Sequence, residues 1–240
     1  MPNIAKRALT SSPKRSVAIF DIDGTIFRSS LLVELTEALI QSGIFTPSVR
    51  KIYGRAYKNW LNRKGPYEQY IAKVVEAFEA HIKGVRSADF LAVAEDVVKF
   101  HQNRIYRFTR DLLAELKKKN YYLLAISHSP KEILDRFGKE LGFDKIYGRI
   151  YELDKRDKLT GRVLYTDFIS DKAKVLERAL AVEDITLKNS VGVGDTESDI
   201  GFLKMVENPI CFNPNAELHK YAKKSNWKIV VERKDVIYHL

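Results

Sequence analysis

Two aspartates stand one residue apart in the segment FDIDGTIF, which covers residues 20–27. Asp21 and Asp23 directly follow residues 17–20, an apolar run with the composition of a buried strand. Because two carboxylates this close repel each other, the pair costs stability unless a cation or a proton neutralises part of its charge. The segment therefore predicts a site at which carboxylates handle a cation or a proton.

The elements that position this segment follow from the pattern of apolar residues. Strand-like runs recur at residues 121–126, 190–193, 210–212 and 227–231. Amphipathic helical patterns lie between them, beginning at Thr109 and Pro130 and covering residues 171–181, 197–206 and 215–224. Apolar strands that alternate with helices indicate a mostly parallel sheet covered on both faces. The predicted fold class is α/β, a three-layered, Rossmann-like arrangement.

Two segments break this alternation. Residues 30–105 contain helical patterns but no convincing strand, with helix starts at Leu31, Thr46–Pro47, Pro66 and Ser87. They predict a helical insertion between the first two strands. Residues 145–166 form two β-rich arms around a charged turn, which indicates an antiparallel hairpin. We expect a flexible basic tail at residues 1–15, a catalytic core at 16–29 and 106–240, and a separate helical unit at 30–105.

The charge balance raises the question of a nucleic-acid partner. The chain of 240 residues has 41 lysines and arginines against 31 aspartates and glutamates, a net charge of +10 at pH 7. A basic surface attracts phosphates of any kind. However, the basic residues are spread along the chain and match no nucleic-acid-binding motif. Nucleic acid is therefore an unlikely partner, and a solvated basic face is the simpler interpretation.

The chain also shows no sign of a membrane partner. No apolar stretch approaches the roughly 20 residues that a membrane-spanning helix needs. The first 16 residues, MPNIAKRALTSSPKRS, are basic but lack the apolar region of a signal peptide. We therefore expect a cytoplasmic protein, and the sequence leaves its oligomeric state undetermined.

Polar residues that could take part in catalysis or ligand binding follow three of the predicted strands. In an open parallel sheet, ligands bind at the carboxyl ends of the strands. There the chain places Asp21 and Asp23, then Ser127, His128 and Ser129, and finally Asp195 and Asp199 in GDTESD, while Lys172 starts a helix. Clustered carboxylates suit a hard cation such as Mg²⁺, which takes carboxylate, carbonyl and water oxygens. A magnesium site would explain the opening pair of aspartates.

The same residues resemble a known enzyme family. In chain order, DIDGT, Ser127, Lys172 and GDTESD resemble the four motifs of the haloacid dehalogenase-like (HAD) phosphatase superfamily. The helical insertion resembles its C1-type cap, and GRIYEL, LTGRV and CFNPNAELHKYAKKSNW resemble the phosphoserine phosphatase-like subfamily IB. The resemblance implies magnesium-dependent hydrolysis of a small phosphorylated metabolite through an aspartyl-phosphate. A phosphotransferase with the same intermediate, or a nucleic-acid-binding protein on this scaffold, is the alternative.

The resemblance also implies a role for each motif residue. Asp21 is the expected nucleophile and Asp23 the general acid and base. The expected magnesium ligands are Asp21, the backbone carbonyl of Asp23, and Asp195, with Asp199 behind them. Ser127 and Lys172 are expected to bind the phosphate of the substrate.

Several assignments stay open at this stage. Lys174 competes with Lys172 for the role of site lysine, and His128 is expected to shape the pocket without acting as a base. Five aromatic residues of the insertion are candidates for substrate contact, although amphipathic helices usually bury such rings in their core. They are Tyr53, Tyr57, Trp60, Tyr67 and Tyr70.

The substrate itself is not fixed by the motifs. Phosphoserine phosphatases carry a cap glutamate nine residues after the nucleophile, which holds the amino group of phosphoserine, but this chain has Ser30 at that position. Glu34 and Glu37 lie nearby at a different offset. We therefore expect phosphoserine not to be the preferred substrate.

Overall fold

The computed structural model describes residues 13–240, so most of the predicted basic tail lies outside the described residues. The described part contains one sheet of eight strands in the order β4-β3-β2-β1-β5-β6-β7-β8. The strands are β1 (Arg15–Phe20), β2 (Tyr122–Pro130), β3 (Lys145–Leu153), β4 (Leu159–Leu164), β5 (Ile185–Gly194), β6 (Asn208–Phe212), β7 (Lys228–Arg233) and β8 (Val236–His239). All pairings from β3 through β7 are parallel, and the two edge strands pair antiparallel.

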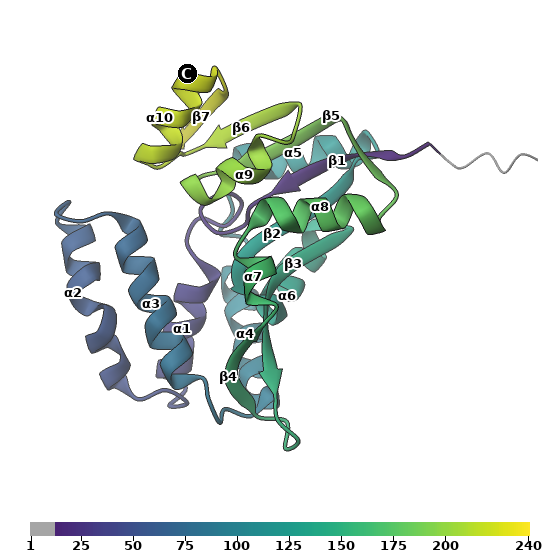
Figure 1. Cartoon of the computed structure of the whole chain (residues 1–240). Helices are drawn as coiled ribbons and strands as arrows, with labels where there is room; N and C mark the ends of the chain where they lie inside the picture. The colour runs from purple at the N-terminus through teal and green to yellow at the C-terminus, as the bar shows by residue number, and fades with distance from the viewer. Residues whose placement is uncertain (1–12) are drawn as a thin grey trace, which may run out of the picture.

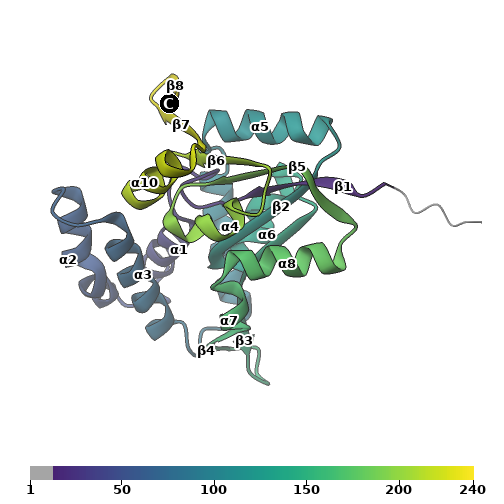
Figure 2. The ribbon, with the colours of Figure 1, turned by 45° about the horizontal axis from the view of Figure 1, so that its top comes forward.

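Helices cover both faces of this sheet, as the apolar runs predict. Helices α5 (Arg107–Lys118) and α6 (Lys131–Leu141) lie on one face, and α8 (Lys172–Val182), α9 (Ile200–Leu203) and α10 (Ala216–Ser225) lie on the other (Figure 2). In β1, the side chains of Val17 and Ile19 pack toward α8, while Ala18 and Phe20 pack toward α5 and α6. All four are fully buried, which is why residues 17–20 contain no polar side chain.

The helical insertion stands beside the sheet and connects β1 with α5. It contains α1 (Leu31–Gln41), the 3₁₀ helix η1 (Pro47–Val49), α2 (Arg50–Leu61), α3 (Tyr67–His81) and α4 (Ser87–His101). Figure 1 shows α2 and α3 as an antiparallel pair at the outer side, with α1 and α4 nearer the sheet. Fully or almost fully buried rings of Phe45, Phe78 and Phe90 hold these helices together. Helices α1, α3 and α4 start within one residue of the predicted positions, and the second helical pattern starts as η1 at Pro47 and continues as α2 from Arg50.

The predicted hairpin is confirmed, and it also extends the sheet. The first part of β3 pairs parallel with β2, whereas its second part pairs antiparallel with β4. The short helix α7 (Thr166–Ile169) follows β4. The hairpin turn also meets the insertion, because the Ser87 amide donates to the Asp157 carbonyl.

Three boundaries differ from the prediction. The strand expected at residues 190–193 begins at Ile185, because its first half is polar and gave no apolar run. The helix expected at residues 197–206 is the 3₁₀ helix η2 (Glu197–Asp199) followed by α9, which ends at Leu203 so that the chain can turn into β6. Strand β8 was missed because it has only four residues and follows β7 after a two-residue turn; three of the four are exposed at the sheet edge. Between residues 13 and 240, no helix is both long and apolar enough to cross a membrane.

Candidate active site

The two aspartates at the end of β1 have different surroundings. Asp21 is 4% exposed, and its Oδ1 accepts a hydrogen bond from Lys172 Nζ at 2.6 Å. Asp23 is held by neutral donors instead: its Oδ1 accepts from the Leu31 amide, and its Oδ2 accepts from the hydroxyls of Ser127 and Ser129, both at 2.7 Å. One carboxylate is therefore paired with a cation, and the other lies among hydroxyl and amide donors.

Lys172 joins two aspartates at the centre of the site. Its ammonium group lies 2.6 Å from Asp21 Oδ1 and 2.6 Å from Asp199 Oδ1, and the residue is 3% exposed. Asp171 caps the helix by accepting from the Ala173 and Lys174 amides, which places Lys172 on the inner side of the first turn. Lys174 is exposed to solvent. The structure therefore places Lys172, and not Lys174, at the site.

Asp199 is fixed by the loop after β5. Its Oδ2 accepts hydrogen bonds from the amides of Asp195 and Thr196, both at 3.0 Å, and its Oδ1 accepts from Lys172. Gly194 permits this approach, since a Cβ there would lie 2.5 Å from the Cβ of Asp199. Asp199 is completely buried, with both carboxylate oxygens bonded, so it organises the loop as much as it contributes charge.

Asp195 approaches the turn of the first motif. Its Oδ1 accepts from the Thr25 hydroxyl at 3.2 Å. Gly24 lies directly beneath it with φ +82°, and a Cβ on Gly24 would stand 2.1 Å from Asp195 Oδ2. Glycine is required here both for the left-handed backbone and for the space that Asp195 occupies.

Three of these carboxylates form a group that fits a metal ion. Ligand oxygens of Asp21, Asp195 and Asp199 all lie within 4.8 Å of one another. An all-oxygen donor set of carboxylates is the set that Mg²⁺ prefers. The side chain of Asp23 is not in this group, because it points to Ser127 and Ser129. Any contribution of Asp23 to the metal therefore has to come from its backbone carbonyl.

Burial shifts the ionisation of these groups. It raises the pKa of Asp21 to about 7 against the lowering effect of Lys172, and it raises the pKa of Asp195 well above its ordinary value. Burial also raises the pKa of Asp23, although its hydroxyl and amide donors oppose the shift. For Lys172 burial lowers the pKa, but Asp199 and Asp21 outweigh it, so the net pKa lies well above the ordinary value. The site concentrates negative charge that a divalent cation would neutralise.

A cavity of about 280 Å³ opens above these residues, between the sheet and the insertion. From the core it is lined by Asp21, Asp23, His128, Ser129, Lys172 and residues 195–198; from the insertion it is lined by Ser30, Leu32, Tyr67, Glu68, Ile71, Ala72 and Val75. Ser127 is completely buried and does not line the cavity. Ser129, which the sequence reasoning gave no role, stands on the cavity wall and bonds Asp23.

Comparisons with known proteins identify the family of this arrangement. A family model described as haloacid dehalogenase-like hydrolase matches residues 18–204, which include every carboxylate described above and Lys172. The chain belongs to the HAD-like hydrolase family. The family resemblance drawn from the four motifs is therefore confirmed.

Individual relatives of this HAD-like chain include phosphoserine phosphatases. A phosphoserine phosphatase of Archaeoglobus fulgidus is 24% identical over 217 residues, covering 90% of this chain, and the chain spans 58% of that relative's length. A solved protein of unknown function from Bordetella pertussis Tohama I superposes with a TM-score of 0.72 at 17% identity, covering 90% of this chain and 98% of its own. A phospho-aspartyl intermediate analogue of phosphoserine phosphatase superposes with a TM-score of 0.59 at 24% identity, covering 92% of this chain and 95% of its own. These structures show a shared fold.

The aromatic residues of the HAD-like chain's insertion divide into two groups. Tyr67 lines the catalytic cavity. Tyr53, Tyr57, Trp60 and Tyr70 instead pack against one another, and with Tyr67 they line a separate hollow between α1, α2 and α3. Only one of the five candidate rings therefore borders the catalytic cavity.

Neither glutamate near Ser30 replaces the missing cap glutamate. Glu34 accepts hydrogen bonds from Ser29 and Arg104, both at 2.8 Å. Glu37 accepts from Arg50 and from the Tyr53 hydroxyl. Both line the separate hollow and not the catalytic cavity, which Ser30 borders.

His128 lines the cavity as a neutral side chain. Burial, together with the smaller effects of the Lys172 and Arg149 charges, lowers its pKa to about 4. At neutral pH it therefore adds neither charge nor an effective base. This agrees with the expectation that it shapes the pocket.

Proposed function

We propose that this HAD-like hydrolase is a cytoplasmic, magnesium-dependent phosphatase that cleaves a small phosphomonoester through an aspartyl-phosphate on Asp21. The observation that carries the proposal is the position of Asp21. Its carboxylate lies on the wall of the cavity, paired with Lys172 and within a group of carboxylates that fits a magnesium ion. Relatives named phosphoserine phosphatase support a phosphatase activity.

The first step would be attack of a carboxylate oxygen of Asp21 on phosphorus, with departure of the alcohol from the opposite side. Lys172 bonds Oδ1 of Asp21 and so orients the carboxylate while offsetting its charge. Magnesium, held by Asp21, Asp195 and the backbone carbonyl of Asp23, would neutralise phosphate charge and align the group for attack.

Asp23 is suited to moving the proton. The departing alkoxide needs a proton, and burial raises the pKa of Asp23, which favours the protonated carboxyl group that can supply it. After the alcohol leaves, the Asp23 carboxylate takes a proton from the water that attacks the aspartyl-phosphate. Ser127 and Ser129 hold Oδ2 of Asp23 and fix the direction in which the group works. We assign Ser127 to this positioning and, on the family resemblance, to contact with the phosphate of a bound substrate.

The helical insertion, residues 30–105, would act as the cap that closes the cavity over the substrate. Seven of the cavity-lining residues come from this insertion and the others from the core. Closure of such a unit would exclude water from the phosphoryl group during transfer.

Release of nitrophenolate from 4-nitrophenyl phosphate tests this proposal. We expect turnover with Mg²⁺, loss of turnover with EDTA, and loss of turnover in Asp21→Asn, whose side chain is nearly the same shape. Asp184→Asn, the same exchange at an exposed site outside the cavity, is the matched control and should keep the turnover of the wild type. Equal rates with Mg²⁺ and with EDTA would refute the metal assignment, and an active Asp21→Asn would refute the nucleophile. Added alcohols that accumulate as new phosphate esters would identify a phosphotransferase.

A further inference from the structure

The part of the cavity that would hold the alcohol of the substrate has an apolar wall. Leu32 from α1 and Ile71, Ala72 and Val75 from α3 line the insertion side of the cavity. The side chains at positions 71, 72 and 75 lie on one face of α3, because residues three and four apart share a helix face. An aliphatic group next to the phosphate would lose water against this wall and gain contact with it.

Carboxyl groups outnumber basic side chains in the same cavity. Five carboxyl groups line it, Asp21, Asp23, Glu68, Asp195 and Glu197, and the only lysine or arginine among the described lining residues is Lys172. The ammonium of Lys172 is already shared by Asp21 and Asp199. Magnesium and Lys172 can offset the phosphate and the aspartates, but no cation remains for a second anionic group of the substrate.

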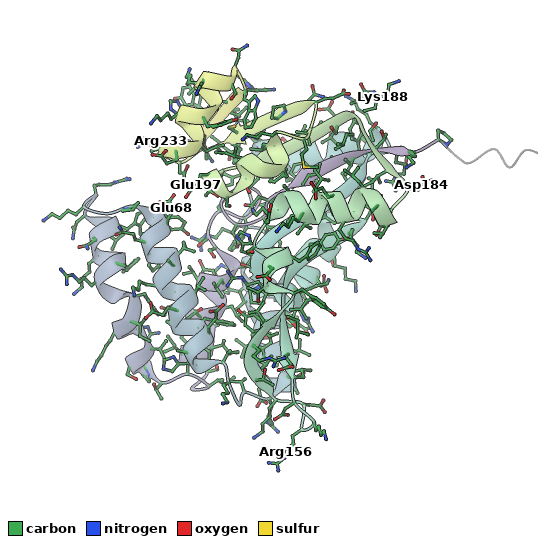
Figure 3. The ribbon with its side chains drawn as sticks, viewed as in Figure 1. Glu68, Arg156, Asp184, Lys188, Glu197 and Arg233 are labelled. Carbon is green, nitrogen blue, oxygen red and sulfur yellow. The ribbon has the colours of Figure 1, made fainter. Side chains whose placement is uncertain are left out.

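Glu68 and Glu197 bring two of these negative charges together at the seam between insertion and core. Both accept hydrogen bonds from the same side-chain nitrogen of Asn215, at 2.6 Å for Glu68. Figure 3 shows them adjacent where α3 approaches the core. No ion pair with either is formed within residues 13–240. Arg63 lines the neighbouring groove and not the catalytic cavity.

We propose that the substrate is a phosphomonoester of a non-acidic alcohol, with aliphatic carbon beside the phosphate and either no further charge or a positively charged nitrogen. This inference rests on the proposed phosphatase function and specifies its substrate class. In phosphoserine only two carbons separate the phosphate oxygen from the carboxylate, so the carboxylate has to enter the cavity with the phosphate. There it would lie beside other carboxylates and an apolar wall, with no cation to pair with. Like-charge repulsion and the loss of water from an unpaired charge both disfavour binding of such a ligand.

The test compares two substrates that differ only in the carboxylate, O-phosphoethanolamine and O-phosphoserine. We expect kcat/KM to be at least about tenfold higher for phosphoethanolamine, because unpaired like charges in an interface typically cost several kcal/mol. A second matched pair, propyl phosphate and 3-phosphooxypropionate, repeats the comparison without an amino group. A kcat/KM for either acid that equals or exceeds that of its partner would overturn the inference.

Variants at the seam identify the cause of the discrimination. Glu68→Gln combined with Glu197→Gln keeps acceptors for Asn215 and removes both charges. The ratio of kcat/KM for phosphoethanolamine to kcat/KM for phosphoserine should therefore decrease severalfold. Glu217→Gln is the matched control, because Glu217 is exposed and lines the neighbouring groove but not the cavity; its ratio should equal that of the wild type. An unchanged ratio in the folded double variant would show that Glu68 and Glu197 do not cause the discrimination against the carboxylate. Activity on 4-nitrophenyl phosphate is measured in parallel, so that failure of the phosphatase proposal is distinguished from failure of the specificity inference.

Discussion

Replacement of Lys172 by methionine removes the one ammonium group that lies between Asp21 and Asp199. Methionine has a similar length and no charge, so the main change is the loss of the ammonium group. Both hydrogen bonds at 2.6 Å disappear, and two almost fully buried carboxylates face each other without a cation. Removing one partner of a buried ion pair typically costs about 3–5 kcal/mol, since the remaining charge stays buried.

This cost should appear as a large loss of thermal stability. For a chain of 150–250 residues, each kcal/mol lowers the melting temperature by roughly 2–4 °C, so we expect a decrease of roughly 6–20 °C for Lys172→Met in EDTA. Lys174→Met is the matched control, because it changes the same residue type two positions along the helix at an exposed site. Its melting temperature should stay close to that of the wild type.

Two further measurements separate charge from packing. Lys172→Met combined with Asp199→Asn removes one of the stranded charges and should recover part of the lost stability. Burial raises the pKa of Asp21 to about 7, so below that pH its carboxyl is protonated in the folded protein and one of the two charges that Lys172 balances is gone. The destabilisation should therefore be smaller at pH 5 than at pH 8. A melting temperature equal to that of Lys174→Met at pH 8, or a loss that does not depend on pH, would refute the reasoning.

Three other perturbations test separate parts of the site. Asp23→Asn should lose about 100- to 10,000-fold in kcat/KM, which reports transfer of the phosphoryl group to Asp21, on an alkyl phosphate and much less on 4-nitrophenyl phosphate, whose leaving group needs little protonation; equal losses in kcat/KM on both substrates would argue against Asp23 as the acid. Gly24→Ala should raise the Mg²⁺ concentration required for half-maximal activity, because the new Cβ would displace Asp195. Gly43→Ala is the control: it has the same left-handed strain, its Cβ would have no atom within 4 Å, and it should leave the required Mg²⁺ concentration unchanged. The increase in melting temperature caused by Mg²⁺ should grow between pH 5 and pH 8, because the raised pKa values of Asp21 and Asp195 make metal and protons compete for the same carboxylates; a constant increase over this range would contradict those shifts.

The sequence was sufficient to predict most of the fold because burial controls the pattern of its strands. Residues 17–20 are apolar without interruption because helices cover both faces of β1, and the insertion was visible because four helical patterns replace the expected strand. Strand β8 could not be predicted in this way. It is held by backbone pairing with β7 at the edge of the sheet, and its side chains carry no apolar alternation.

The sequence predicts the position of a site residue well where that residue directly follows a strand. It does not predict hydrogen-bond partners that are set by the packing of distant segments. The structure brings Asp21, Asp195, Asp199 and Lys172 together, which the order of the motifs led us to expect. It also bonds Ser127 to Asp23, a contact that strand order alone cannot specify. Glu68 and Glu197 were not predicted to share Asn215, because they lie 129 residues apart and the shared hydrogen bonds depend on how α3 approaches the core.

The central claim is a phosphoryl group covalently attached to Asp21, and the Asp23→Asn variant offers the most direct measurement of it. With 4-nitrophenyl phosphate and Mg²⁺, this variant should form the aspartyl-phosphate but hydrolyse it slowly, because the base that activates water is missing. We predict a burst of one nitrophenolate per active site and, after acid quenching and proteolysis, a phosphoryl group on the peptide that contains Asp21. Steady turnover of the wild type without a burst in the folded variant, and without phosphoryl label on that peptide, would contradict the account.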